Sequence, residues 1–137
     1  MRYEVVNPEP LGAPSGWNHG MVGPAGGRVL FIAGQTGVSR ADGSEPTDFV
    51  GQFGAALENI LTVVREAGGE PSDVGRLTIY VTSIEAYLGS LKPLGTVYRE
   101  AMGQHYPAMA LVEVVRLVDP RAVVEIEATA ILGPSAE

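Results

Sequence analysis

The sequence predicts one α+β domain over residues 1–137, with a mixed six-stranded sheet and two helices packed on one face of it. The first reason is length, because 137 residues suit a single domain around one core. The second is composition: 45 % of the residues are hydrophobic and 18 % are charged, which supplies a core and shows no signature of disorder. The third is the order of strand-like and helix-like segments, ββ, β, α, β, α, β, β, which is typical of a mixed sheet with inserted helices.

The first third of the chain predicts three strands. Residues 3–6 (YEVV) favour an edge strand, because the following Pro8 cannot donate to a ladder. Residues 18–22 favour a second strand, and the glycine-rich turn at residues 23–27 (GPAGG) predicts a hairpin to the next one. Residues 29–33 (VLFIA) form a continuous apolar run, the pattern of a central strand that is covered on both faces.

A helical pattern begins after a polar stretch. Residues 41–43 (ADG) predict a tight turn within that stretch. Apolar side chains then recur every three or four residues over residues 49–64, which indicates an amphipathic helix. Thr47 or Asp48 can cap its start, and the glycine pair at residues 68–69 ends it.

A strand and a second helical region follow. Residues 76–81 (RLTIYV) favour a strand, because they are rich in β-branched and aromatic side chains. Thr82 and Glu85 have the spacing of a capping box at the start of the helical region. Pro93 lies inside that region and removes a backbone hydrogen bond, so we expect a kink or two shorter helices.

The last two predicted strands, residues 108–117 and 123–132, alternate between two kinds of face. Alternation puts Glu125 on the polar face of the second strand, and Met109 with Leu111 on one face of the first. If the two strands pair, a single face carries the carboxylate together with these apolar side chains. Two interpretations stay open for it: a solvated strand face, or a partly enclosed site, covered by another subunit, where a carboxylate orients water.

The composition disfavours several function classes. A net charge of −7 argues against binding to nucleic acid or to an anionic membrane. The absence of cysteine and the presence of only two histidines predict no metal site, and no motif for a phosphate loop or a serine triad occurs. No apolar run is long enough for a membrane span or a signal peptide, so we expect a cytoplasmic protein.

Two loops contain further candidate residues. Residues 34–37 (GQTG) follow the apolar strand, where loops commonly present ligands. His19, beside Trp17 and Asn18, has the chemistry of a general acid or base, although exposure or a plain hydrogen bond explains such a histidine equally well.

Taken together, these segments resemble the Rid family, the YjgF-like proteins also called reactive intermediate deaminases. The resemblance covers nearly the whole chain and keeps the order of the family's segments. Those segments are SGW at residues 15–17, VLFIAGQTG at 29–37, LENI at 57–60, AG at 67–68, RLTIYV at 76–81, Tyr98, YPA at 106–108 and VEIEA at 124–128.

The resemblance implies a chorismate-mutase-like fold and a homotrimer whose sheets form a barrel, with ligand clefts between subunits. It also implies hydrolysis of an enamine or imine to a carbonyl compound and ammonia, with no metal or cofactor. Glu125 matches the family's glutamate that positions the attacking water, so it is the predicted catalytic residue. The predicted substrate-binding residues of the cleft are Trp17, Asn18, His19, Gly34, Gln35, Tyr98, Met109 and Leu111.

The chain departs from the family pattern inside that cleft. The family has an arginine directly after Pro-Ala, where its guanidinium clamps the substrate carboxylate. Here Pro107 and Ala108 are followed by Met109, which can neither carry a charge nor donate a hydrogen bond. The chain therefore resembles an arginine-lacking subgroup with a less anionic ligand, in which His19 could supply part of the missing charge. Extra residues around 89–93 could reshape the rim of the cleft.

Two other functions stay open beside the deaminase. One is a non-catalytic trimer that binds a small molecule or a protein partner, which the methionine favours. The other is an endoribonuclease or translation inhibitor, a label attached to the family, which the net charge of −7 disfavours.

Overall fold

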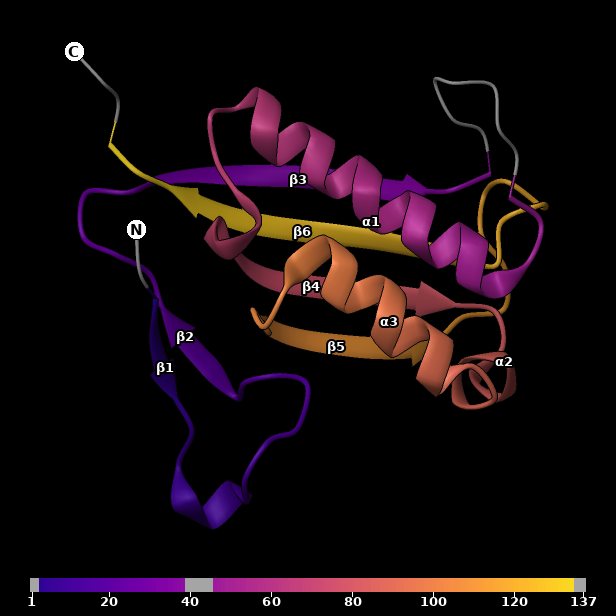
Figure 1. Cartoon of the computed structure of the whole chain (residues 1–137), viewed down its shortest axis with the longest axis horizontal. Helices are drawn as coiled ribbons and strands as arrows, with labels where there is room; N and C mark the ends of the chain where they lie inside the picture. Colours follow the sequence, from indigo (N-terminus) through magenta and orange to yellow (C-terminus); the bar gives the residue numbers. More distant parts are fainter. Residues whose placement is uncertain (1–2, 39–45, 135–137) are drawn as a thin grey trace.

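The computed structural model describes residues 3–38 and 46–134 as two sheets with three α-helices (Figure 1). The turn predicted at residues 41–43 lies outside the described residues. In chain order the elements are β1 (Glu4–Val6), a 3-10 turn (Glu9–Leu11), β2 (Gly20–Val22), β3 (Arg28–Thr36), α1 (Phe49–Glu66), a 3-10 turn (Pro71–Asp73), β4 (Val74–Val81), α2 (Ile84–Leu88), α3 (Leu91–Met102), β5 (Ala108–Glu113) and β6 (Val124–Leu132).

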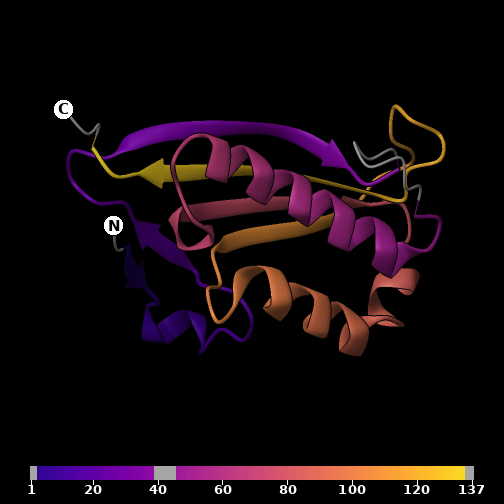
Figure 2. The ribbon, with the colours of Figure 1, turned by 45° about the horizontal axis from the view of Figure 1, so that its top comes forward.

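The main sheet has four strands in the order β3-β6-β4-β5. β4 and β5 run parallel, whereas β6 is antiparallel to both of its neighbours, so the predicted mixed sheet is confirmed. The parallel pair needs a crossover connection, and α2 with α3 supplies it. Figure 2 shows α1 and α3 on the same side of this sheet, as the sequence predicts, and its other face is left open in the single chain.

The expected single sheet of six strands is wrong, because β1 and β2 pair only with each other. The expected hairpin across residues 23–27 is wrong for the same reason: β2 pairs with β1, and β3 pairs with β6. A three-residue strand offers few ladder bonds, whereas β3 and β6 are nine residues each. The N-terminal segment is instead fastened by Tyr3, whose hydroxyl donates to the Asp73 carbonyl oxygen at 2.5 Å and accepts from the Ile131 amide at 3.0 Å.

The apolar strand β3 lies at the edge of the sheet and not at its centre, which corrects the sequence prediction. Ile32 points under the helices and is 4 % exposed, but Phe31 is 81 % exposed and Val29 is 55 % exposed on the open face. A continuous apolar run predicts that both faces are covered, and one chain covers only one of them. The other side of β3 is therefore an apolar surface available to a second molecule.

The long helix α1 forms where the apolar period predicts it. Leu57, Ile60 and Leu61 are fully buried against the sheet, which gives the core its centre. Asp48 occupies the N-cap position without a side-chain hydrogen bond. Gly68 has a φ of +88°, a left-handed conformation that favours glycine and ends the helix.

The second helical region is divided, as Pro93 predicts. The proline lies in the first turn of α3, where its missing N–H is not needed by the helix. The predicted capping box of Thr82 and Glu85 is wrong by one residue, because Ser83 is the N-cap of α2 and its hydroxyl accepts from the Ala86 amide at 3.1 Å. Thr82 and Ser83 both have a side-chain hydroxyl, so the sequence spacing could not decide which of them accepts the hydrogen bond from a free backbone amide of the first helical turn.

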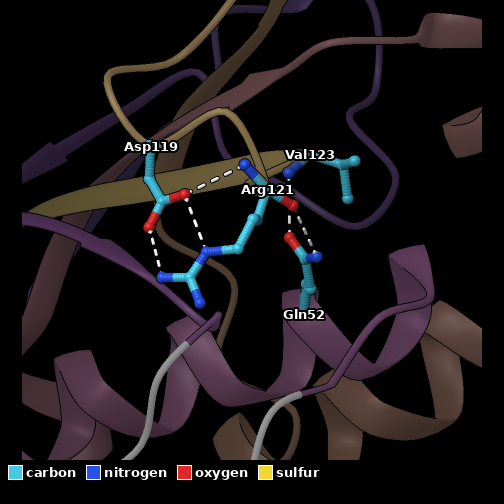
Figure 3. Close-up of polar contacts among 4 residues, drawn as sticks. All are labelled: Gln52, Asp119, Arg121 and Val123. Carbon is cyan, nitrogen blue, oxygen red and sulfur yellow. Dashed lines mark hydrogen bonds and ion pairs between the residues drawn. The ribbon is translucent and has the colours of Figure 1, made fainter.

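A buried glutamine joins α1 to the loop before β6 (Figure 3). The Gln52 side chain is 2 % exposed; its Nε2 donates to the Arg121 carbonyl oxygen at 3.0 Å and its Oε1 accepts from the Val123 amide at 2.8 Å. The same loop is shaped by Asp119, which accepts from the Arg121 backbone amide and side chain. These hydrogen bonds from Arg121 lower the pKa of Asp119.

Tyr98 joins α3 to the segment before β5. Its hydroxyl donates to the His105 carbonyl oxygen at 2.6 Å, and its ring stacks on Tyr106 at 5.3 Å between centroids with an interplanar angle of 8°. Burial, with a smaller contribution from Tyr106, raises the pKa of Tyr98 far above its ordinary value of 10.0. Tyr98 therefore keeps its proton in the folded state, and its hydrogen bond and ring contact hold the side chain in one position.

Replacing Gln52 by leucine should lower the free energy of unfolding by about 1–3 kcal/mol, because the hydrogen bonds from its buried side chain to the Arg121 carbonyl oxygen and the Val123 amide are lost. Urea unfolding at a fixed protein concentration measures the change. Gln104→Leu is the matched control, since Gln104 is exposed and should change the stability little. Equal effects of the two substitutions would contradict a structural role for the Gln52 hydrogen bonds.

The raised pKa of Tyr98 predicts a pH-dependent stability. Above about pH 10 the unfolded tyrosine ionises while the folded one does not, so the free energy of unfolding should fall as the pH rises. Tyr98→Phe should make this fall shallower and, from the lost hydrogen bond, cost about 1 kcal/mol at neutral pH. Urea unfolding from neutral pH to about pH 11 tests both effects. Tyr87→Phe is the control, and identical slopes for both variants and the wild type would refute the prediction.

Candidate functional site

The main sheet divides the predicted site residues between its two faces. β4 lies between β5 and β6, so β5 does not pair with β6. The shared face of Glu125, Met109 and Leu111 that such pairing would have created is therefore not formed. Leu77, which is buried under the helices, is opposite Met109, whereas Tyr80 on the open face is opposite Glu125. Met109 and Leu111 therefore lie on the helix side, and Glu125 lies on the open side. Alternation within a strand was predictable, but the phase between strands depends on which strands are neighbours.

A cavity of about 680 Å³ lies on the helix side, beside the edge strand β5. It brings together four of the predicted residues, which are Trp17, Tyr98, Met109 and Leu111. Its volume falls within the range of small-molecule sites, roughly 300–1,000 Å³. The helix-side group, as we call these four residues, thus forms a site that can enclose a ligand.

The walls of the cavity come from α2, α3 and a loop. The apolar stripe that the helical period predicts, Tyr87, Leu91, Leu94 and Tyr98, lines it from the two helices. Trp17 lines it from the loop between β1 and β2. Ring faces and aliphatic side chains dominate this surface, so the cavity suits a ligand with a flat or apolar part.

One functional candidate was missed by the sequence reasoning. Arg99 on α3 lines the cavity, and it is the only charged side chain among the described residues that do so. It follows Tyr98 directly and lies one helical turn after Gly95, which also lines the cavity. The helical period that predicts the orientation of Tyr98 could have found it.

Asn18 and His19 lie beside this cavity rather than in its lining. The Asn18 side-chain amide donates to the Tyr106 carbonyl oxygen at 2.6 Å, which attaches the Trp17 loop to the segment before β5. The His19 ring is 3.0 Å from the Gly12 carbonyl oxygen through Nε2 and meets the Trp17 ring edge-on, with centroids 4.6 Å apart. Both side chains thus position the tryptophan.

Glu125 and Gly34 form a second group, the open-face group, on the other side of the sheet. Gln35 is not part of this group, because the register pairs it with Ile126, which is buried beneath the helices. The pairing of β3 with β6 shifts register between Ile32 and Gln35, and this irregularity places Gly34 against the Glu125 carboxylate. A side chain at Gly34 would overlap Glu125 Oε2, so glycine is required at this close approach. Gln35 turns back to donate to the Ala33 carbonyl oxygen at 3.2 Å.

The carboxylate of Glu125 makes no hydrogen bond or ion pair with the described residues, which leaves its oxygens available to water or a ligand. Its neighbour Glu127 is engaged, since it accepts from the Tyr80 hydroxyl at 2.7 Å. That hydrogen bond is the main reason why the pKa of Tyr80 is raised. Of the two carboxylates on this face, Glu125 is therefore the one suited to orient a water molecule.

Other site classes find no support in the described part of the chain. No cluster of three or more His, Cys, Asp or Glu side chains there could hold a metal ion. None of the described helices is long and apolar enough to cross a membrane.

Comparisons with known proteins agree with this architecture. The family model described as endoribonuclease L-PSP matches residues 9–132. A RutC family protein of Haemophilus influenzae is 31 % identical over 106 residues, covering 77 % of this chain and 80 % of the relative. The 2-iminobutanoate/2-iminopropanoate deaminase of Escherichia coli strain K12 is 30 % identical over 109 residues, covering 77 % and 80 %.

Solved structures of the same family are also similar to this chain. A Rid-family protein of unknown function from Yersinia pestis superposes with a TM-score of 0.80 at 34 % identity, covering 96 % of this chain and 100 % of the other. Escherichia coli TdcF, solved with bound serine, superposes with a TM-score of 0.64 at 28 % identity, covering 86 % and 95 %. The chain therefore belongs to the endoribonuclease L-PSP family, the family of the Rid and YjgF proteins.

Proposed function

We propose that this protein is a cytoplasmic, cofactor-free hydrolase of a small enamine or imine metabolite, and that it works as a homotrimer. The observation that supports it best is the half-buried Glu125 carboxylate, which lies beside Gly34 without a hydrogen bond or ion pair to the described residues. The deaminase names of relatives in the same family support the reaction class. Nucleic acid and membranes are not partners in this proposal, given the net charge of −7.

The trimer explains how two separated groups can form one cleft. The open face exposes Val29, Phe31 and Val112, and apolar side chains there favour contact with another copy. β3 and β5 are opposite edges of the sheet. A three-fold ring joins unlike surfaces of successive copies, so the helix-side group of one copy can meet the open-face group of the next.

In the proposed reaction Glu125 accepts a proton from water as the water oxygen attacks the imine carbon. The electron pair of the C=N bond moves to nitrogen, which takes the proton that Glu125 removed from water. Collapse of the tetrahedral intermediate then breaks the C–N bond and forms the C=O bond, while Glu125 passes the hydroxyl proton to nitrogen, so ammonia leaves and water is the only co-reactant. By the family resemblance, the Gly34 carbonyl holds the leaving amine and the Leu111 amide stabilises the developing oxyanion.

Met109 makes the cleft atypical. It lines the cavity from β5 at the place where the family resemblance puts the carboxylate-clamping arginine. A hydrogen bond to a charged group contributes about 1.5–3 kcal/mol, and methionine provides none of it. A carboxylate bound at that strand would thus be desolvated without a partner.

The methionine also favours a second candidate function, a trimer that binds a small molecule without turnover. Such a protein would be stabilised thermally by its ligand while releasing no product. An endoribonuclease activity is the least supported function, and labelled RNA that stays intact during long incubation with the protein would dispose of it.

Phe31→Glu should convert the trimer to smaller species, because a charge would then replace the most exposed apolar side chain of β3 in the proposed contact surface. Light scattering measures the mass, and the wild type should show three times the mass of one chain. Leu88→Glu is the control, since Leu88 is an exposed apolar residue on α2, away from that face. A monomeric wild type would rule out the intersubunit cleft.

Glu125→Gln should reduce imine hydrolysis by about 100-fold, because the general base is lost. An amino-acid oxidase generates the imine in situ, and ammonia release above the uncatalysed rate is followed. Glu127→Gln is the control on the same face of the same strand and should keep the wild-type rate. A Glu125→Gln variant as fast as the wild type would refute the proposed role.

The same assay tests Met109→Arg. Acceleration by the wild type would show that the cleft hydrolyses imines without the arginine on β5. Acceleration by Met109→Arg alone would show that the scaffold is competent and that the natural ligand differs from amino-acid-derived imines, which favours the binding function.

A further inference from the structure

We propose that the helix-side cavity binds a carboxylate whose side group is an aromatic ring, and that Arg99 is the residue that binds the carboxylate. The proposal names the ligand class of the cleft under Proposed function, and it rests on that function only in treating the cavity as part of the cleft. It requires no turnover.

The charge argument rests on Arg99. No acidic side chain lines the cavity among the described residues, and the guanidinium forms no ion pair or hydrogen bond with them. Gly95, one turn earlier, leaves room for it: a Cβ there would be only 3.0 Å from Arg99 Nη1. Arg99 is an exposed residue at the border of this apolar cavity, and its guanidinium can bind a carboxylate through two parallel hydrogen bonds.

The aromatic argument rests on the other walls. The rings of Tyr98 and Tyr106 stack on each other and both residues line the cavity, and the Tyr98 hydroxyl already donates to the His105 carbonyl oxygen. Trp17 and Tyr87 add two further rings to the lining. Stacking against such rings stabilises a bound aromatic ring beyond the burial of its surface.

The size of the cavity and the position of Met109 also favour a ligand with an aromatic side group. The cavity of about 680 Å³ in the single chain has room for a side group larger than that of an acid of three or four carbons. The thioether of Met109 lines the cavity and makes favourable contacts with aromatic rings. The methionine therefore contacts the side group, while the cation lies on α3 rather than on β5.

The test uses the protein's single tryptophan, Trp17, as the reporter in the cavity. Fluorescence titrations compare 3-phenylpropanoate with the neutral 3-phenylpropanamide and with propanoate. The wild type should bind 3-phenylpropanoate at least about tenfold more tightly than either comparison compound. Arg99→Gln should lose the preference for acid over amide while still binding the amide, and Arg99→Lys should keep part of that preference.

Lys92→Gln is the matched control, because it removes the same charge from the same helix at an exposed residue outside the cavity lining. Equal affinity of the wild type for acid and amide, an unchanged preference in Arg99→Gln, or an equal loss in Lys92→Gln would each overturn the proposal. Circular dichroism confirms that the Arg99 variants are folded.

The result of the binding test can be distinguished from the result of the hydrolysis test for the proposed function. Binding and turnover are measured separately, because tryptophan fluorescence reports binding in the cavity and ammonia release reports the reaction at Glu125. Imine hydrolysis without carboxylate-selective binding would overturn this inference and leave the hydrolase. Arg99-dependent binding without hydrolysis would support the inference and leave the binding function in place of the hydrolase.

Discussion

The burial of one side of β6 beneath α1 is the constraint on which the rest of the structure depends. Val124, Ile126 and Ala130 are fully buried, and alternation then forces Glu125 to the opposite face. Because β6 pairs with β3 on one side and with β4 on the other, its phase also decides which face of both neighbours is buried. The position of the candidate catalytic carboxylate is thus a consequence of how the core is packed.

The close approach at Gly34 extends this constraint to the site. An irregularity in β3 lets the backbone come up against Glu125, and only the absence of a side chain makes this possible. The carboxylate lies against the Gly34 backbone and makes no ion pair or hydrogen bond with the described residues. That combination suits a group that must stay free to take a proton from water.

The crossover from β4 to β5 creates the cavity. Two short helices instead of one long helix let Tyr87 approach from α2 while Leu94 and Tyr98 approach from α3. Pro93 enforces this division, since it belongs in a first turn and not in a helix interior. The same geometry brings Arg99 to the cavity and leaves Met109 on the strand wall, so the position of the cation differs from what the family resemblance implies.

The sequence by itself determined the α+β class, the extents of α1 and β4, the division at Pro93 and the alternation along β6, because each follows from local periodicity or from the chemistry of one residue. Only the tertiary structure decided that β3 is an edge strand, that β1 and β2 form their own sheet, and that Met109 and Glu125 lie on opposite faces. It also revealed Arg99 as a residue of the cavity. Periodicity gives the faces of each element separately, whereas neighbours and relative phase are chosen by long-range pairing and burial, which no local pattern contains.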